Sequence, residues 1–305
     1  MYIGIDIGGS AIKYGLVDET GQVTNKNSIP TNRSKEAITQ QLVQMIQFFK
    51  QRVKNIQGVG ISAPGVIKAN GFMETAGAIE SLYEVNLKDL IEEQVNLPVY
   101  VENDANAAAI AEQWIGNAQD CQNYLCLVLG TGIGGGIVIN GEVFRGHHGM
   151  AGEFGWMLID HLPTSGNIET SSLNYRGAVI GGLCRRYNRQ MLELDSSFQK
   201  TYNAQEIFKL EESNPVAKKV IASFYQELAI GLINLISCFD PEKILIGGAI
   251  SANSEFFKRL TNEVGQLTQN HGGLKHMKQL ASIEPAKLKN DAGLIGAVYQ
   301  LAKHI

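Results

Sequence analysis

Two glycine-rich turns follow strand-forming residues in this 305-residue chain. The first lies in residues 6–13, which read DIGGSAIK. A turn of two glycines and a serine between antiparallel strands can point backbone N–H groups at an anion, and Asp6 can hold a hydrated cation beside that anion. An ordinary hairpin in which Asp6 ends a strand accounts for the same residues, so this motif alone leaves both interpretations open.

The second turn, residues 130–136 (GTGIGGG), has the glycine spacing of a dinucleotide-binding fingerprint. That fingerprint requires a helix directly after the glycines. Residues 133–139 (IGGGIVI) instead predict a strand, and Asn140-Gly141 is typical of a hairpin turn. We therefore interpret the motif as a second glycine hairpin in which the Thr131 hydroxyl faces a phosphate. The chain contains no P-loop sequence.

A carboxylate suited to proton transfer occurs at Asp104, within residues 102–106 (ENDAN). Asp104 opens a predicted helix, so simple N-capping is one interpretation. In the other, the helix N-terminus keeps Asp104 ionised, and its carboxylate accepts a hydroxyl proton during phosphoryl transfer. The neighbouring Asn103 would then donate hydrogen bonds to a polyol and accept them from it.

Two further motifs lie in the second half of the chain. Residues 147–156 (HHGMAGEFGW) contain two adjacent histidines, which extended backbone would point in different directions and which therefore make a poor metal pair. Glu153, between two glycines, is a better candidate to bond a ligand hydroxyl. Gly247-Gly248 follow an apolar strand, where they allow an aromatic base to lie on the backbone or a helix to pack tightly.

The elements that position these residues follow from hydrophobic periodicity. Strands are predicted at 2–8, 11–17, 22–29, 58–63, 98–102, 124–130, 133–139, 142–144 and 243–247, and helices at 34–53, 104–115, 215–239, 253–270 and 291–303. A strand, a glycine turn and a second strand thus occur twice, beginning near residues 3 and 124. This duplication predicts an α/β protein with two similar lobes and a cleft between them.

Composition excludes several classes of protein. The net charge of −4 argues against a nucleic-acid surface, and the sequence has neither a basic n-region with an apolar h-region nor a long uninterrupted apolar run. The four cysteines form no C-x-x-C pair and predict reduced, mostly structural thiols. We expect a cytoplasmic protein without nucleic-acid or membrane partners.

The order of the motifs resembles the ROK family of sugar kinases, which belongs to the actin-like ATPase clan. The resemblance rests on DIGGS at 6–10, SAPG at 62–65, ENDAN at 102–106, LGTGIGGG at 129–136, AGEFG at 151–155, IGGAI at 246–250 and DAGLIGA at 291–297. It implies a two-lobed, ribonuclease H-like α/β fold with mixed sheets flanked by helices and a central cleft. We expect residues 1–103 plus about 291–305 to form the smaller lobe and 104–290 the larger one.

The resemblance also implies the roles of individual residues. Asp104 would be the catalytic base, and the sugar ligands would be Gly65, Asn103, Asp104 and Glu153. The ATP site would comprise Asp6, Gly8, Gly9, Ser10, Lys13, Gly130, Thr131, Gly132, Gly134, Gly247 and Gly248, with Asp6 holding Mg²⁺ through water. Closure of the lobes over ATP and sugar would exclude competing water. A homodimer is expected.

One segment departs from the family pattern. Family glucokinases and repressors usually carry a histidine after the AGE stretch and then a cysteine-rich zinc loop, whereas this chain has Trp156 at the histidine position and no cysteine in 160–176. We therefore expect no structural zinc and an altered grip on the anomeric hydroxyl. Trp156 could offer a flat apolar face to an aglycone or fill the core.

The variant motifs look most like those of bacterial β-glucoside kinases. They imply ATP-dependent phosphorylation of the 6-hydroxyl of the non-reducing glucose in β-glucosides such as cellobiose. A glucokinase or N-acetylmannosamine kinase of the same family is the main alternative. A family repressor would need a winged helix before the first phosphate motif, which begins at residue 3, and a non-catalytic sugar sensor would lack the base at Asp104.

Overall fold

The structure is a computed structural model that describes all residues, Met1–Ile305. The chain forms two compact units. The first comprises Met1–Cys126, Gly136–Gly152 and Ala286–Ile305, and the second comprises Leu127–Gly135 and Glu153–Pro285. Each unit is α/β, which confirms the predicted fold class.

The first unit is built on a five-stranded mixed sheet of order β3-β2-β1-β4-β7. Its strands are β1 (Tyr2–Ile7), β2 (Ala11–Val17), β3 (Val23–Pro30), β4 (Val59–Ala63) and β7 (Val99–Asn103). β1, β2 and β3 pair antiparallel, whereas β4 and β7 run parallel to β1. The carboxyl ends of β1, β4 and β7 therefore meet at one edge of the sheet.

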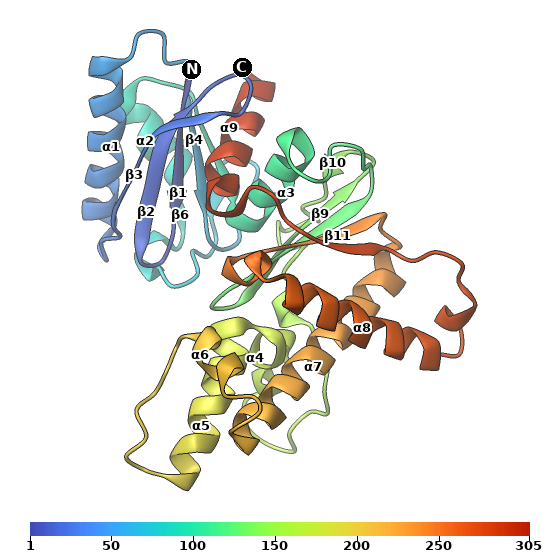
Figure 1. The fold of residues 1–305 in the computed structure, drawn as a ribbon. Coiled ribbons are helices and arrows are strands. Elements are labelled where there is room, and N and C mark those ends of the chain that lie inside the picture. The colour runs from blue at the N-terminus through green and yellow to red at the C-terminus, as the bar shows by residue number, and fades with distance from the viewer. The chain divides into compact units, whose positions relative to one another are not determined.

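Helices cover both faces of this sheet (Figure 1). α1 (Lys35–Arg52) and α2 (Leu87–Val95) pack on one face, and α9 (Ala292–His304) packs on the other beside α3 (Asp104–Ile115). Ser34 caps α1 by accepting a hydrogen bond from the Ala37 amide, as its sequence position predicts. The apolar stripe of α1 is buried against the isoleucines of β1, which gives the unit a continuous core.

A second five-stranded sheet repeats this arrangement. Its order is β10-β9-β8-β11-β12, from β8 (Tyr124–Leu129), β9 (Ile133–Ile139), β10 (Glu142–Val143), β11 (Lys243–Gly247) and β12 (Ser282–Pro285). In both sheets the first three strands in the chain lie in reverse order and are followed by two more, which confirms the predicted duplication. A small separate pair, β5 (Phe72–Met73) and β6 (Val85–Asn86), lies in the first unit.

The residues after the second glycine turn form β9, so the dinucleotide-binding interpretation is excluded. The hairpin turn that follows has positive φ angles at both central residues, 54° at Asn140 and 76° at Gly141. Such angles match a type I′ turn, which Asn-Gly favours. A local sequence signal thus correctly predicted both the strand and its turn.

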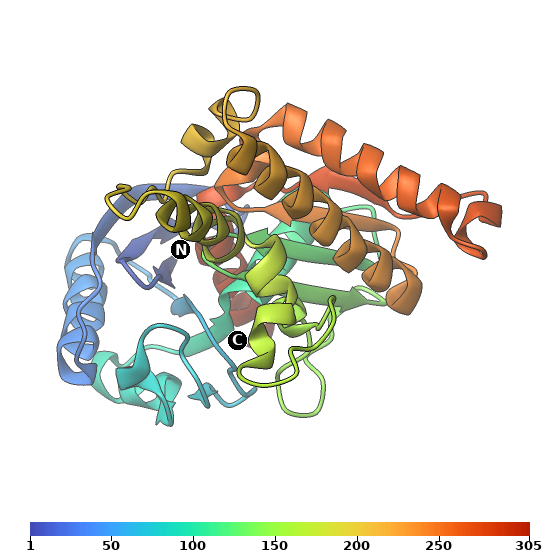
Figure 2. The same ribbon diagram turned by 90° about the horizontal axis from the view of Figure 1, so that it is seen from below.

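The second unit contains the longest helices. α7 (Pro215–Phe239) and α8 (Ser254–Asn270) lie side by side (Figure 2), and α4 (Leu173–Gly177), α5 (Arg185–Leu194) and α6 (Ala204–Lys209) also pack against α7. α7 is long and apolar enough to cross a membrane by length and composition alone. More than half of the most apolar stretch of α7 is buried within the protein, as expected of a core helix.

Several elements lie outside the sequence prediction. The helices α2, α4, α5 and α6 and the strands β5, β6 and β12 were not predicted, because each is short and gives only a weak periodic signal. α3 belongs to the first compact unit, and the central turn of the second sheet, Leu127–Gly135, belongs to the second unit. The lobe boundaries drawn from the sequence, 1–103 with about 291–305 and 104–290, stay a prediction about functional lobes.

Candidate active site

Three parallel strands of the first unit place polar residues in one row. The register pairs Asp6 of β1 with Ser62 of β4, and Ser62 with Glu102 of β7. The segments that follow these strands begin at Gly8, Pro64 and Asp104 and leave the sheet at the same edge. Ligands of open α/β sheets bind outside such carboxyl ends, so the topology brings together residues that are far apart in the sequence.

Asp6 is mostly buried and has two side-chain partners. The Ser62 hydroxyl donates to Asp6 Oδ1 at 2.6 Å, and Lys13 Nζ lies 3.4 Å from Oδ2. Gly293 of α9 packs against the same carboxylate, where an added Cβ would lie 2.8 Å from Oδ1. Asp6 therefore has a fixed orientation. Ser62 is a positioning residue that sequence analysis did not identify, because only the pairing of β1 with β4 brings it there.

The first glycine turn supplies fewer free amides than we expected. The Gly8 N–H donates to the Ala11 carbonyl at 3.0 Å, and the Gly8 carbonyl accepts from the Thr31 hydroxyl at 2.6 Å. The N–H groups of Gly9 and Ser10 carry no such bond and are available to an anion. Gly8 therefore shapes the turn, and the next two residues offer the donors.

Asn103, not Asp104, caps helix α3. Its Oδ1 accepts from the amides of Ala105 and Asn106 at 3.0 Å, and its Nδ2 donates to the Gly65 carbonyl at 2.9 Å. The capping interpretation of Asp104 is therefore wrong. The acceptor of Asn103 is occupied by the helix, so the expected two-way contact with a polyol is reduced to one remaining N–H donor.

Asp104 occupies the first position of α3, and its side chain is exposed. Its Oδ1 accepts from the Ala105 amide at 2.8 Å. The positive end of the helix dipole favours the ionised carboxylate. Gly65 adopts φ +97°, and a Cβ there would collide with the Thr75 carbonyl oxygen, so its glycine is required by the fold. The edge of the first unit thus presents a carboxylate beside an amide donor.

The second unit holds the other glycine loop. The Gly130 amide donates to the Gly132 carbonyl at 2.9 Å, and residues 180 and 181 donate to the carbonyls of Gly130 and Thr131 at 3.0 Å. Thr131 is exposed at the tip of the turn, and Gly134 lies in β9. The loop backbone is therefore held from one side by the segment after α4.

Asn174 links this loop to the AGEFG motif. Its Oδ1 accepts from the Ile133 amide at 2.6 Å, and a Cβ on Gly132 would lie 3.2 Å from the same oxygen. Gly155 packs directly against Asn174 as well. No spacing in the sequence points to Asn174, because its partners lie about 20 and 40 residues earlier.

Gly247 and Gly248 end β11 beside the end of β8. Gly248 has φ +92°, and a Cβ there would collide with the Leu129 carbonyl oxygen. The Ser251 amide and hydroxyl both donate to the Gly248 carbonyl, at 3.0 and 2.7 Å. The second unit therefore brings both of its predicted nucleotide-binding glycine segments together.

Glu153 lies directly before a short 3-10 helix, Phe154–Trp156, in the second unit. Burial raises the pKa of Glu153 above that of a free glutamate. Trp156 is 53% exposed, so the core-filling interpretation of this residue is wrong. Its amide donates to the Glu153 carbonyl at 3.0 Å, which joins a candidate sugar ligand to an exposed indole.

His147 and His148 do not point apart as expected. Their rings contact each other edge to face, with centroids 4.5 Å apart. Neither ring belongs to a group of side chains that could hold a metal ion.

A cavity of about 460 Å³ in the first unit is lined by Tyr100, Arg145 and His304 among others and contains none of the predicted site residues. The four cysteines are free, and all but Cys238 are buried.

Comparison with known proteins gives this arrangement a context. Residues 2–304 match the ROK family. A β-glucoside kinase of Listeria innocua serovar 6a is 36% identical over 299 residues, covering 96% of this chain and 95% of that protein.

Solved structures agree with the family match. A Listeria monocytogenes protein provisionally described as an N-acetylmannosamine kinase has 35% identity and a TM-score of 0.84, with 99% of each chain covered. A ROK family glucokinase from Streptomyces griseus, in complex with glucose and AMPPNP, has 28% identity and a TM-score of 0.80, again with 99% of each chain covered.

Proposed function

Because this chain belongs to the ROK family and is a sugar kinase, we propose that it phosphorylates the 6-hydroxyl of the non-reducing glucose of a β-glucoside such as cellobiose, with ATP as donor. The observation that supports the chemistry most is Asp104, an exposed carboxylate at the start of α3 beside the amide of Asn103. The β-glucoside kinase of Listeria innocua supports the substrate class.

Asp104 acts as the general base in this proposal. The sugar O6 attacks the γ-phosphorus, the bond between that phosphorus and the bridging oxygen of ADP breaks, and the hydroxyl proton passes to the Asp104 carboxylate. The helix N-terminus keeps the carboxylate ionised before transfer. Asn103, held by Gly65 and by the helix amides, uses its remaining N–H to orient a sugar hydroxyl.

The nucleotide is bound by backbone groups. In the first unit the N–H groups of Gly9 and Ser10 face phosphate oxygens, with Gly8 shaping the turn and Lys13 supplying positive charge. In the second unit Gly130, Thr131, Gly132 and Gly134 form the other phosphate loop, and Gly247 and Gly248 lie against the adenosine. Glycine at these positions lets the ligand approach the main chain closely.

Asp6 fits a hydrated Mg²⁺. It is a single carboxylate whose orientation is set by Ser62 and Lys13, and Mg²⁺ in phosphoryl-transfer sites keeps several waters and binds through one or two carboxylates plus the substrate phosphates. The ion would neutralise charge on the phosphate oxygens when bound. Asp6 itself contributes a fixed negative group on the phosphate side of the sheet edge.

Selectivity for a glucoside arises on the anomeric side of the sugar. A pocket built to donate to a free anomeric hydroxyl would hold unpaired polar groups when that oxygen carries a second sugar. The carbonyl of Glu153, a candidate sugar ligand, accepts from the Trp156 amide, and the exposed indole offers a flat apolar face to the aglycone. In this proposal Glu153 binds the sugar, and Trp156 contacts the aglycone.

The alternative function is phosphorylation of a free sugar, glucose or N-acetylmannosamine. The names of the two solved relatives favour it. The deciding experiment measures kcat/KM for cellobiose, an aryl β-glucoside, glucose and N-acetylmannosamine, and locates the phosphate by NMR. We expect the glucosides to be used at least as well as glucose, with phosphate on O6. Turnover of free sugars without any turnover of glucosides would instead establish the alternative.

Assembly and location are also proposals. We expect a cytoplasmic homodimer whose small-molecule partners are ATP and the sugar, without nucleic-acid or membrane partners. Light scattering coupled to gel filtration measures the assembly directly. A mass near that of one 33.2 kDa chain across a range of concentrations would contradict the dimer.

A further inference from the structure

The segment after Trp156 forms a long loop that ends in a short 3-10 helix, Ile168–Ser171. Residues 160–169 are all exposed, and the segment contains no cysteine that could cross-link it. Its two ends are joined by backbone bonds: the Ile159 amide donates to the Ser171 carbonyl at 2.9 Å, and the Leu173 amide donates to the Met157 carbonyl at 2.8 Å. An exposed loop of this length needs additional contacts to keep one conformation.

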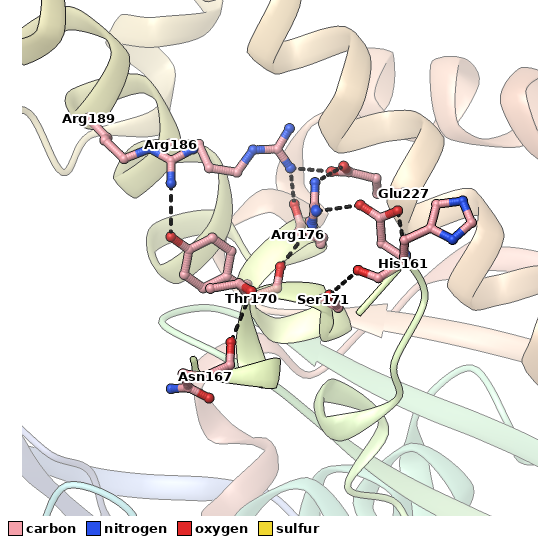
Figure 3. Close-up of polar contacts among 10 residues, drawn as sticks. His161, Asn167, Thr170, Ser171, Arg176, Arg186, Arg189 and Glu227 are labelled. Atoms are coloured by element: carbon pink, nitrogen blue, oxygen red, sulfur yellow. Dashed lines mark hydrogen bonds and ion pairs between the residues drawn. The ribbon is translucent and has the colours of Figure 1, made fainter. Parts of the chain in front are cut away.

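Arg176 supplies those contacts from α4 (Figure 3). Its guanidinium forms an ion pair with Asp160 at the start of the loop and donates from Nε to the Thr170 carbonyl at the end, at 2.9 Å. A third contact joins Arg176 Nη1 to Glu227 Oε1 of α7 at 3.1 Å. One side chain therefore holds both ends of the loop against a core helix.

A second arginine completes this cluster. Arg186 forms an ion pair with Glu227, and its Nη1 also donates to the Arg176 carbonyl at 3.1 Å. The Ser171 hydroxyl donates to the His161 carbonyl at 2.6 Å beside it. Figure 3 shows both guanidinium groups converging on Glu227. The two arginines balance the two carboxylates, so the cluster is neutral and its members are paired.

The arginine cluster (Asp160, Arg176, Arg186 and Glu227) is only partly exposed. The side chains of Arg186 and Glu227 are 8% and 15% exposed, and those of Arg176 and Asp160 are 25% and 37% exposed. Charge-assisted hydrogen bonds in such surroundings are stronger than ion pairs on an open surface. The cluster is therefore able to hold the loop in one conformation before any ligand binds.

The loop that Arg176 holds carries apolar side chains at its surface. Leu158, Leu162 and Ile168 are about half exposed, as is Trp156 at its base. Trp156 is bonded through its amide to Glu153, the candidate sugar ligand. The loop with these exposed apolar side chains thus begins a few residues after Glu153, which would hold the glucose ring.

We propose that Arg176 is a positioning residue for substrate selection, because it preorders the loop 157–172 as an apolar wall for the aglycone of a β-glucoside. This inference rests on the proposed function. A preordered wall binds its ligand without the entropic cost of ordering a loop. Loss of Arg176 therefore weakens the binding of glucosides, which reach the wall. It leaves the binding of free glucose unchanged, because free glucose does not reach the wall.

The test compares Arg176→Gln with Arg189→Gln. Arg189 is an exposed arginine of α5 that bonds only the Tyr175 hydroxyl, at 3.3 Å, and pairs loosely with Glu193, so it is a matched control outside the cluster. We expect Arg176→Gln to raise the KM for cellobiose roughly tenfold. This is the size of effect expected from the loss of one hydrogen bond to a charged group. The kcat, the KM for ATP and the KM for glucose should change less than about twofold, and Arg189→Gln should match the wild type.

Hydrogen exchange of the Ile159 and Leu173 amides is the second readout, because it requires no substrate. Arg176→Gln should speed exchange at these amides while α7 stays protected. If Arg176→Gln does not fold, Asp160→Asn removes one arm of the cluster at an exposed position and should give the same pattern more weakly. Unchanged exchange, or faster exchange with an unchanged KM for cellobiose, overturns the inference.

The two proposals fail in different ways. A wild-type enzyme that phosphorylates only free sugars overturns the proposed function and with it the aglycone wall. In that case the hydrogen-exchange rates alone still test whether Arg176 orders the loop. A wild-type enzyme that uses cellobiose, with an Arg176→Gln variant that uses it equally well, overturns only the inference about Arg176.

Discussion

Arg145 forms an ion pair with Glu102, whose side chain is almost completely buried at the end of β7, directly before Asn103. The other carboxylate oxygen of Glu102 accepts from the Asn103 amide at 3.0 Å and from Asn106 Nδ2 at 3.4 Å. Burial, and then the charge of Glu102, raises the pKa of the adjacent Tyr100 to about 12, so its phenol stays protonated. The pair therefore anchors the turn that presents Asp104.

Arg145→Ala should destabilise the protein strongly, because it leaves the buried Glu102 carboxylate without its cation. We expect a loss of about 3 kcal/mol or more in the free energy of unfolding, the usual result of breaking a buried pair. Urea denaturation measures it. The pair of Lys88 and Glu92, whose side chains are each about one third exposed, is the matched control, and Lys88→Ala should change stability by less than about 1 kcal/mol. Equal effects of the two variants would contradict this prediction.

Asp104→Asn should lower kcat by about 10²–10⁴-fold, which is the typical contribution of a general base. The affinity for ATP should stay nearly unchanged, because the nucleotide is assigned to other residues. Steady-state kinetics with the preferred sugar, together with nucleotide binding by calorimetry, checks both statements. Near-normal turnover by a folded Asp104→Asn protein would remove this residue from the role of base.

The protein should fold and act without zinc. Residues 160–176 offer only His161 and two acidic side chains, and Asp160 is already paired with Arg176. A structural zinc site needs four Cys or His ligands in a closed tetrahedral set. Metal analysis should find well under one zinc per chain, and a chelator should leave the melting temperature unchanged. Stoichiometric zinc whose removal unfolds the protein would be the opposite result.

Glu153 should make stability depend on pH in a defined direction. Burial raises its pKa in the folded protein. The folded state therefore binds the proton more readily than the unfolded state, and this group lowers stability as pH rises above the ordinary glutamate pKa of about 4.3. Glu153→Gln removes that penalty, so its stability relative to the wild type should be greater at pH 7 than at pH 4.

Thermal unfolding of the Glu153 variant and the wild type between these two pH values measures the difference. The same substitution should raise the KM for the sugar, because a carboxylate accepts hydroxyl hydrogen bonds more strongly than an amide does. A stability difference that is constant over the pH range would show that Glu153 titrates as it does in the unfolded chain.

The sequence by itself determined the elements whose signals are local. Strand alternation, the Asn140-Gly141 turn, the Ser34 cap and the apolar periodicity of residues 215–239 depend on neighbours a few residues apart, and each element has the predicted form. The repeated strand–turn–strand pattern likewise predicted a duplication, and the two sheets do have the same strand order. Such features follow from backbone geometry and side-chain spacing alone.

Only the tertiary structure decided which polar groups are left for ligands. Asn103 rather than Asp104 caps α3 because the end of β7 directs its side chain to the helix amides and to Gly65. Arg176 reaches Glu227, 51 residues later in the chain, because α4 packs on α7. These partners are distant in sequence and meet through packing of the core, so no local pattern of residues could have predicted them.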